Sequence, residues 1–268
     1  MAQLIRSAES ASSWTDHDLA SYNIDVSSVE PDDFFHTADP SIDHIDREIL
    51  ELPASNNSPA VSGLAISYLS RIHDTRMYRE EATIDTLVAS TMELLEFAEP
   101  PATVVYRRII PLTICGDNGR VAQTDVSLVR RSFHLIIVEN KTSTNTSDPE
   151  PQVIAQAIAA FQWNNKERRH HGLDPLDSMT IPCVTMSGTC PDFYLVPVTK
   201  ALDNAVRQGR RPSVKTHVLR CETLATHEEY VGGTGMEDPQ YRMLVLRRFL
   251  AFRELARGHW TPFLAGLG

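Results

Sequence analysis

The 268-residue sequence is poor in cysteine, with only Cys115, Cys183, Cys190 and Cys221, and no two of these form a C-x-x-C pair. Such sparse cysteines exclude a disulfide-rich scaffold and predict reduced thiols in an intracellular protein. No apolar run approaches the roughly 20 residues that a membrane-spanning helix needs, so we expect no membrane partner. The first residues lack a positively charged segment followed by an apolar stretch, so no signal peptide is predicted.

Two common nucleotide-binding motifs are also missing. No Gly-Lys dipeptide occurs in the chain, which excludes the usual phosphate-binding loop. Residues 232–235 (GGTG) lack the third glycine of a dinucleotide-binding fingerprint, and no helical pattern follows them directly. The His170-His171 pair has no third ligand at a fixed spacing, so it does not predict a metal site.

Basic residues are outnumbered, because 25 Lys and Arg stand against 35 Asp and Glu for a net charge of −10. An excess of acid argues against a polyanionic partner such as nucleic acid. However, residues 1–60 contain twelve acidic and two basic residues, so they carry the whole net charge and residues 61–268 are neutral. The sequence therefore predicts an acidic leader over 1–60, partly mobile or docked through its apolar side chains, and a single domain over 61–268.

Within the neutral domain the basic residues form three local clusters. They are Lys166, Arg168 and Arg169; Arg207, Arg210, Arg211 and Lys215; and Arg247, Arg248, Arg253 and Arg257. Such clusters are typical of surfaces that contact a phosphate backbone, although a solvated helix or loop face has the same composition. We hypothesise that the acidic leader competes with nucleic acid for these clusters.

Periodicity and turn residues predict alternating helices and strands. The first helix is expected over 76–98, where apolar residues recur every three or four positions before a Pro-Pro pair. Strands are expected over 103–115, 121–129, 133–139, 181–186, 193–198 and 213–220, with a turn at 116–119. Further helices are expected from Asp148-Pro149, over 200–208 with Gly209 at its end, and from Asp238-Pro239 to Gly258. This order predicts an α/β fold with a mixed central sheet flanked by helices.

Polar residues end the most apolar predicted strand. Residues 133–139 (FHLIIVE) are nearly all apolar, as in a strand buried on both faces, yet Glu139 and Lys141 stand at its end. Side chains alternate along a strand, so these two point to the same face. If the preceding strand pairs with this one, Asp125 lies opposite residues 137–139.

Two carboxylates on adjacent strands supply the oxygen ligands that Mg²⁺ or Mn²⁺ prefers. The metal polarises a phosphoryl oxygen, and Lys141 is placed to orient a water. A surface ion pair between Glu139 and Lys141 is the alternative explanation, and such a pair contributes little to stability.

The spacing Asp125-x(13)-Glu139-x-Lys141 between two predicted helices resembles the PD-(D/E)XK, or restriction-endonuclease-like, nuclease superfamily. The resemblance implies a restriction-endonuclease-like core in the order α-β-β-β-α-β-β, here with N-terminal and C-terminal extensions. The family pattern has Pro before the Asp, where this sequence has Thr124.

The same resemblance implies a carboxylate on the helix before the sheet and a glutamine on the helix after it. Glu81 matches the carboxylate and is expected on the core-facing side of its helix, with Glu80 as the alternative. Gln152 matches the glutamine, with Gln156 as the second choice.

A longer resemblance covers most of the chain. The segments WTDHDLASYNIDV (14–26), EATIDTLVASTMELLEF (81–97), IIPLTICG (109–116) and AQTDVSLV (122–129) are similar to segments of uncharacterised fungal proteins built on this nuclease fold. The same holds for DPEPQVIAQAIAAFQWNN (148–165) and IPCVTMSGTCPDFYLVPVT (181–199).

These resemblances imply a nuclease that hydrolyses phosphodiester bonds with Mg²⁺ or Mn²⁺, with DNA as the favoured substrate. The expected metal ligands are Asp125, Glu139, the backbone carbonyl of Asn140, and Glu81 for a second metal or through water. Lys141 is expected to position the attacking water, and Gln152 to orient a ligand or a water.

A function of a different class stays open. The fold is also compatible with a catalytically inactive nuclease-fold module that binds nucleic acid or a protein partner. A homodimer is a further possibility, because the last predicted helix is apolar enough to form an interface.

Overall fold

The computed structural model describes residues 6–37, 39–55, 58–142, 145, 147–223 and 235–267. A mixed seven-stranded sheet in the order β1-β9-β8-β7-β6-β5-β2 forms its centre, and β3 and β4 form a separate two-stranded sheet. The strands are β1 (Ile24–Ser28), β2 (Ala102–Tyr106), β3 (Ile109–Ile114), β4 (Asp117–Gln123), β5 (Val126–Arg130), β6 (Phe133–Lys141), β7 (Ser178–Ser187), β8 (Cys190–Thr199) and β9 (Thr216–Glu222). The pairs β1–β9 and β6–β7 are parallel, and the other neighbours are antiparallel.

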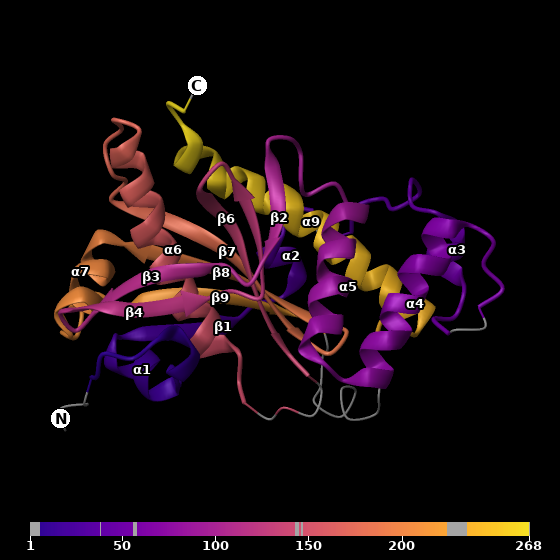
Figure 1. The fold of residues 1–268 in the computed structure, drawn as a ribbon, viewed down its shortest axis with the longest axis horizontal. Helices are drawn as coiled ribbons and strands as arrows, with labels where there is room; N and C mark the ends of the chain where they lie inside the picture. Colours follow the sequence, from indigo (N-terminus) through magenta and orange to yellow (C-terminus); the bar gives the residue numbers. More distant parts are fainter. Residues whose placement is uncertain are drawn as a thin grey trace.

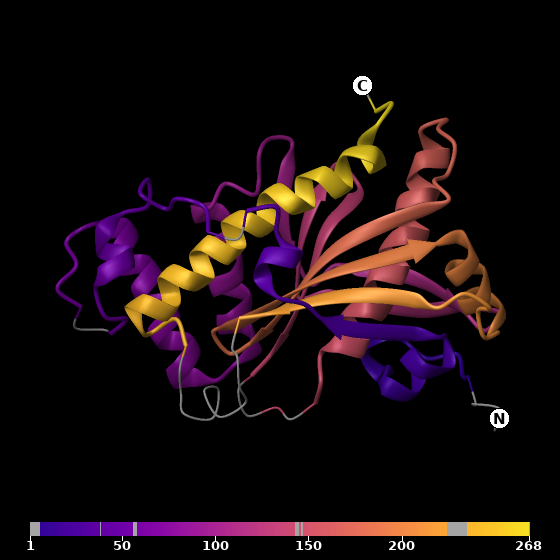
Figure 2. The same cartoon turned by 180° about the vertical axis from the view of Figure 1, so that it is seen from behind.

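Helices cover both faces of this sheet, so the chain is an α/β protein, as predicted (Figures 1 and 2). On one face lie α6 (Glu150–His170), α7 (Lys200–Gln208) and the β3–β4 hairpin, and on the other lie α9 (Pro239–Leu264) and α2 (Pro31–Phe34). At one end of the sheet are α3 (Arg47–Glu51), α4 (Gly63–Tyr78) and α5 (Glu81–Leu94). Beside β1 lies α1 (Asp16–Ser21), and η1 (Ala11–Ser13) packs on α6 and β4. None of the described helices is both long enough and apolar enough to cross a membrane.

The chain from β2 to β5 is one long hairpin that bends in its middle. Its base, β2 and β5, belongs to the main sheet, and its outer half, β3 and β4, packs on α6. The backbone N–H of Arg107 donates to the Asp125 carbonyl at 2.9 Å, and that of Thr124 donates to the Arg108 carbonyl at 3.0 Å. These two bonds carry the hairpin ladder through the bend.

The bend corrects two sequence predictions. The single strands expected over 103–115 and 121–129 are each broken in two. Arg107 adopts a left-handed conformation with φ 48°, which a strand interior does not accommodate. The turn at the hairpin tip lies at Cys115-Gly116, before the predicted position, because β4 already begins at Asp117.

The helix predicted over 76–98 is also wrong. Two helices, α4 and α5, occupy this region, and Arg79, with φ 52°, separates them. A left-handed residue ends a helix because the next N–H group leaves the helical direction. Gly258 does not end α9, which continues to Leu264.

The prediction for residues 200–208 is confirmed as α7. The Thr199 hydroxyl accepts the backbone N–H of Leu202 at 3.1 Å, which satisfies one free donor of the first turn. Gly209 ends the helix with φ 62°, a conformation that glycine adopts without strain.

The described part of the acidic leader packs into the same core as the rest of the chain. Its strand β1 adds an edge to the main sheet beside β9. The buried side chains of the leader include Trp14, Leu19, Tyr22, Phe34, Phe35 and Ile49. The rings of Trp14 and Tyr22 stack with centroids 5.4 Å apart.

Candidate functional site

A buried ion pair stands at the C-terminal end of β6. Lys141 Nζ is 2.7 Å from Glu139 Oε1, and the two side chains are 14% and 1% exposed. The alternative of a surface ion pair is therefore wrong. Gln152 Oε1 accepts a hydrogen bond from Lys141 Nζ at 3.1 Å, so the predicted glutamine contacts the predicted lysine.

Gln156, one turn further along α6, holds the other oxygen of Glu139. Its Nε2 donates to Glu139 Oε2 at 2.6 Å and to the backbone carbonyl of Gln123 at 2.8 Å. One amide group therefore fastens the hairpin bend to the end of β6. Both glutamines that the sequence offered as alternatives take part in the site.

Asp125 lies on the bend itself, directly before β5. Val126 pairs with Val138, as the predicted strand pairing requires, so Asp125 and Glu139 stand beside each other on adjacent strands. The Asp125 Oδ2 atom accepts the backbone N–H of Asn140 at 2.7 Å. This bond orients the carboxylate toward the end of β6.

A carboxylate that the sequence analysis missed lies against the opposite face of β6, on helix α5. Asn140 alternates with Glu139 and Lys141, and its Nδ2 donates to Asp85 Oδ1 of α5 at 2.7 Å. Asp85 is buried, and Arg107 Nε lies 3.8 Å from its Oδ2 atom. The site is thus placed between α5 and α6, at the end of the strand that both helices contact.

Glu81 does not lie where the sequence predicted. It is the first residue of α5, its side chain is exposed, and among the described residues it makes no hydrogen bond or ion pair. Glu80, the alternative, is exposed as well. Glu81 still lies near the site, because its charge raises the pKa of Asp85, Asp125 and Lys141.

Burial and mutual repulsion raise the pKa values of the clustered carboxyls. Burial, with Asp85 and Glu81 adding to it, raises the pKa of Asp125 to about 6 although the Asn140 N–H favours the carboxylate. Burial and then the neighbouring Asp125 raise the pKa of Glu139 to about 8 against the opposing effect of Lys141. The pKa of Asp85 is raised as well, chiefly by burial.

Lys141 shows the opposite balance. Burial lowers the pKa of its ammonium, but Glu139, Glu81 and Asp125 together outweigh burial and raise it. The ammonium therefore stays charged, as its contacts with Glu139 and Gln152 require. One buried cation serves three buried or half-buried carboxyls, so the cluster is rich in negative charge whenever they ionise.

Two buried amide oxygens of the site, Asn140 Oδ1 and Gln156 Oε1, have no hydrogen-bond partner among the described residues. An unsatisfied buried acceptor is costly unless an ion or a water completes it. Gln156 Oε1 lies on the side of Glu139 and Asn140 Oδ1 on the side of Asp85, and carboxylate and amide oxygens are ligand types that Mg²⁺ and Mn²⁺ prefer. In the described ranges no three His, Cys, Asp or Glu side chains are already gathered around one point, so amide or carbonyl oxygens or water would complete the coordination.

The three basic clusters are largely engaged within the protein. Arg168 is buried and donates to the backbone carbonyls of Asp174 and Phe263. The ion pairs in the other clusters are Arg207–Asp203, Lys215–Asp25, Arg247–Asp39, Arg253–Glu254 and Arg257–Glu99. These contacts weaken the predicted role of the clusters in phosphate binding.

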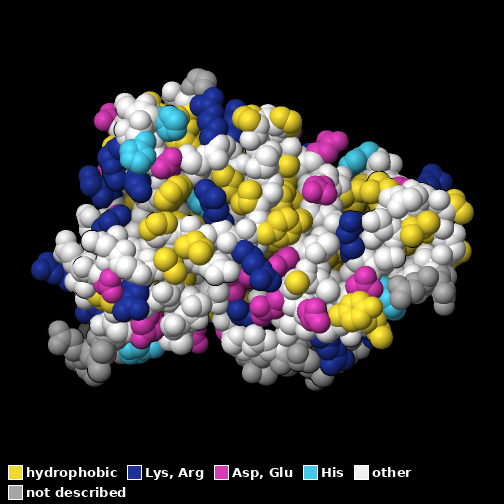
Figure 3. Space-filling view, viewed as in Figure 1, with side chains coloured by type: hydrophobic (Ala, Val, Ile, Leu, Met, Phe, Trp, Pro, Cys, Tyr) yellow, Lys and Arg dark blue, Asp and Glu magenta, His cyan; other side chains and the backbone are white. Residues whose placement is uncertain are grey.

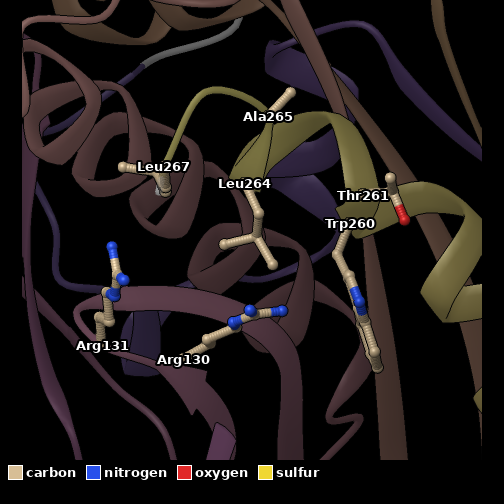
Figure 4. Close-up of a pocket in the computed structure, with 7 residues that line it drawn as sticks. All are labelled: Arg130, Arg131, Trp260, Thr261, Leu264, Ala265 and Leu267. Carbon is tan, nitrogen blue, oxygen red and sulfur yellow. The ribbon is translucent and has the colours of Figure 1, made fainter. Parts of the chain in front are cut away.

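A pocket of about 260 Å³ lies at the other end of β5 (Figure 4). The side chains of Arg130, Arg131, Trp260 and Leu264 surround it. Asp125 precedes the first residue of β5 and Arg130 is the last, so the backbones are roughly 17 Å apart at 3.3 Å per residue. The pocket is therefore separate from the carboxylate cluster.

A scan against protein-family models finds no match to this chain, and a search of curated proteins finds no significant match. Membership of the PD-(D/E)XK nucleases therefore stays a prediction from the sequence.

Proposed function

We propose that this protein is a nuclease-type phosphodiester hydrolase that uses Mg²⁺ or Mn²⁺, with DNA as the favoured substrate. The observation that supports the proposal most is the side-by-side placement of Asp125 and Glu139 on adjacent strands, with the pKa of each raised. Burying like charges costs free energy, and a divalent cation is the charge that such a cluster lacks.

Each residue has a distinct role in this proposal. Asp125 and Glu139 bind the cation, which when bound supplies polarisation of a phosphoryl oxygen. Lys141 holds the attacking water, and Gln152 fixes the Lys141 ammonium. Gln156 is a positioning residue, because it joins Glu139 to the bend that carries Asp125.

Asp85 and Glu81 take different roles. Asp85 acts through Asn140, whose side chain it holds and whose backbone N–H fixes Asp125. Glu81 is the candidate ligand of a second cation, or it steers the first cation through water. Ligation by the Asn140 carbonyl stays a prediction.

Cleavage of DNA tests the proposal directly. We expect plasmid DNA to be nicked in Mg²⁺ or Mn²⁺ but not in EDTA, and Lys141→Ala to lower the rate by roughly a hundredfold or more because it removes the group that holds the water. Lys200→Ala, on the exposed surface of α7, is the matched control and should cleave at the wild-type rate. Equal rates for all three proteins, or full cleavage in EDTA, would contradict the proposal.

The raised pKa values predict how stability depends on pH. Folded Asp125 and Glu139 keep their protons up to about 6 and about 8, whereas unfolded carboxyls release them near pH ~4. The folded state therefore binds more protons in this range, and the free energy of unfolding of the metal-free protein falls as the pH rises from about 4 to 8. Mn²⁺ needs the ionised carboxylates, so its stabilisation should grow over the same range.

Thermal unfolding with EDTA and with Mn²⁺, at about pH 5 and about pH 8, measures both effects. Glu139→Gln is the control, because it should flatten the pH dependence and remove most of the Mn²⁺ stabilisation. A Mn²⁺ effect that is equally large at both pH values in the wild type would count against these carboxyls as ligands.

One observation favours the second candidate, a catalytically inactive nuclease-fold module. Both oxygens of Glu139 already accept hydrogen bonds from protein groups, at 2.7 Å from Lys141 and 2.6 Å from Gln156. The cluster is thus partly satisfied without a cation. Absence of Mn²⁺ binding at roughly millimolar concentration in calorimetry, together with binding of DNA or protein, would favour this module over the enzyme.

A further inference from the structure

Two arginines, one beside Asp85 and one within electrostatic reach of Tyr106, differ from those of the three basic clusters. Arg71, on α4, makes no ion pair with a carboxylate in the described part of the chain. Arg107, on the hairpin bend, has a side chain that is 62% exposed. Its Nε atom is 3.8 Å from Asp85 Oδ2, which is longer than the distance in a tight ion pair. Guanidinium groups without a close carboxylate keep their capacity to bind phosphate.

An exposed aromatic ring stands near both arginines. Tyr106 is the last residue of β2, an edge strand of the main sheet, and it is 52% exposed. Partial burial and then Glu93 and Asp85 raise the pKa of its phenol, whereas Arg71 opposes them, so the ring lies within electrostatic reach of both α4 and α5.

The molecular surface between the β3–β4 hairpin and the α4–α5 pair carries both charged and apolar side chains. Figure 3 shows acidic and basic side chains next to one another in its middle, with apolar side chains around them, between the β3–β4 hairpin and the α4–α5 pair. Exposed apolar residues on the hairpin itself include Ile109 and Val121. Arg107 thus adjoins Asp85, the exposed ring of Tyr106 lies within electrostatic reach of Asp85, and Arg71 lies within electrostatic reach of that ring.

We propose that Arg71, Tyr106 and Arg107, here called the rim, bind a single-stranded segment of nucleic acid beside the carboxylate cluster. This inference rests on the proposed function, whose substrate class it narrows. The two guanidinium groups contact backbone phosphates, and the Tyr106 ring stacks on an unpaired base, which the interior of a duplex does not expose.

The hairpin bend ties the rim to the site. The Arg107 backbone N–H donates to the Asp125 carbonyl at 2.9 Å. The residue proposed to bind phosphate is therefore hydrogen-bonded directly to a residue proposed to bind the metal. A nucleic-acid strand that contacts Arg107 therefore lies next to Asp125. A bound phosphate also reduces the repulsion that the carboxylate cluster exerts on a polyanion, because Arg107 and Arg71 offset that negative charge.

Binding in EDTA isolates the rim from catalysis. The probes are a fluorescent oligothymidylate of about 15 nucleotides and a duplex of the same length, measured by anisotropy with the full chain at roughly 50 to 200 mM salt. We expect the wild type to bind the single strand at least about fivefold more tightly than the duplex. Tyr106→Ala should remove this preference, Tyr106→Phe should keep it, and Arg107→Ala should weaken both complexes and reduce the salt slope by about one.

Arg108→Ala is the matched control, because Arg108 occupies the same bend but acts on His134 instead of the carboxylates. Equal binding of single strand and duplex, unchanged binding by Tyr106→Ala, or an equal loss in Arg108→Ala and Arg107→Ala would each overturn the inference. If the rim binds the single strand but the protein shows no metal-dependent cleavage, the proposed function alone is refuted. Cleavage without rim-dependent binding would remove this inference alone.

Discussion

Replacing Glu139 by glutamine is expected to abolish Mn²⁺ binding and to lower metal-dependent cleavage by at least about a hundredfold, while the protein stays folded. Burial and Asp125 raise the pKa of Glu139 to about 8, so the metal-free protein disfavours the charged form of this carboxyl. A neutral amide has the same shape, and its oxygen still accepts from Lys141, but its NH2 group faces the donor Gln156 Nε2, so we expect a moderate loss of stability. Calorimetry with Mn²⁺, the cleavage rate and thermal unfolding measure the three expectations.

The matched control is Glu51→Gln, since Glu51 is an exposed glutamate of α3. It should leave metal binding, cleavage and stability as they are. Wild-type Mn²⁺ affinity in Glu139→Gln would overturn Glu139 as a ligand. A melting temperature far below that of the wild type would instead show that the Glu139 charge is needed to bury Lys141.

Deleting residues 1–60 is expected to prevent folding. The deletion removes β1 from the sheet and uncovers Phe193, whose ring Phe35 contacts at a centroid distance of 5.7 Å. Burying one large apolar side chain contributes about 1.5–3 kcal/mol, so losing six removes about 9–18 kcal/mol, as much as the roughly 5–15 kcal/mol by which most domains are stable. Circular dichroism and size-exclusion chromatography of the truncated chain check this expectation, which a truncated protein that melts like the wild type would contradict.

The charge of the leader can be tested apart from its packing. Asp25 Oδ1 lies 3.8 Å from Lys215 Nζ, and Asp39 Oδ1 lies 2.5 Å from Arg247 Nη1. Both ion pairs are on the exposed surface. Asp25→Asn and Asp39→Asn should each change stability by less than about 1 kcal/mol. If the leader competes with nucleic acid, as its acidity led us to hypothesise, these variants raise DNA affinity at low salt; unchanged affinity would refute that hypothesis.

The parts of the fold that local chemistry determines were predictable from the sequence. Gly209 predicted the end of α7, and the strand pairing that joins Asp125 to Glu139 followed from the apolar run of β6. The hairpin bend was not predictable, because no glycine or proline occupies positions 107–108 or 124–125. Packing of β3 and β4 against α6 sets the bend, and such tertiary contacts leave no local signal.

The prediction of Glu81, with Glu80 as the alternative, missed Asp85 for a related reason. Glu81 and Asp85 are acids on α5, one turn apart, and which of them is buried depends on how the helix is rotated against the sheet. The sequence did contain a signal, since Asp85, Ala89 and Met92 recur at the spacing of one helix face and all three are buried. An acid within an apolar face is more informative than one at a helix start, where carboxylates are common.

The pairing of β1 with β9 has a consequence for how the chain folds during its synthesis. The paired residues Ser28 and Arg220 are 192 residues apart, whereas α5, the hairpin, β6 and the first turns of α6 are consecutive in the chain. At a translation rate of roughly 5 to 20 residues per second, β9 is synthesised roughly 10 to 40 s after β1. The carboxylate cluster can assemble within that interval from consecutive segments, so the strand that is made first is among the last to dock.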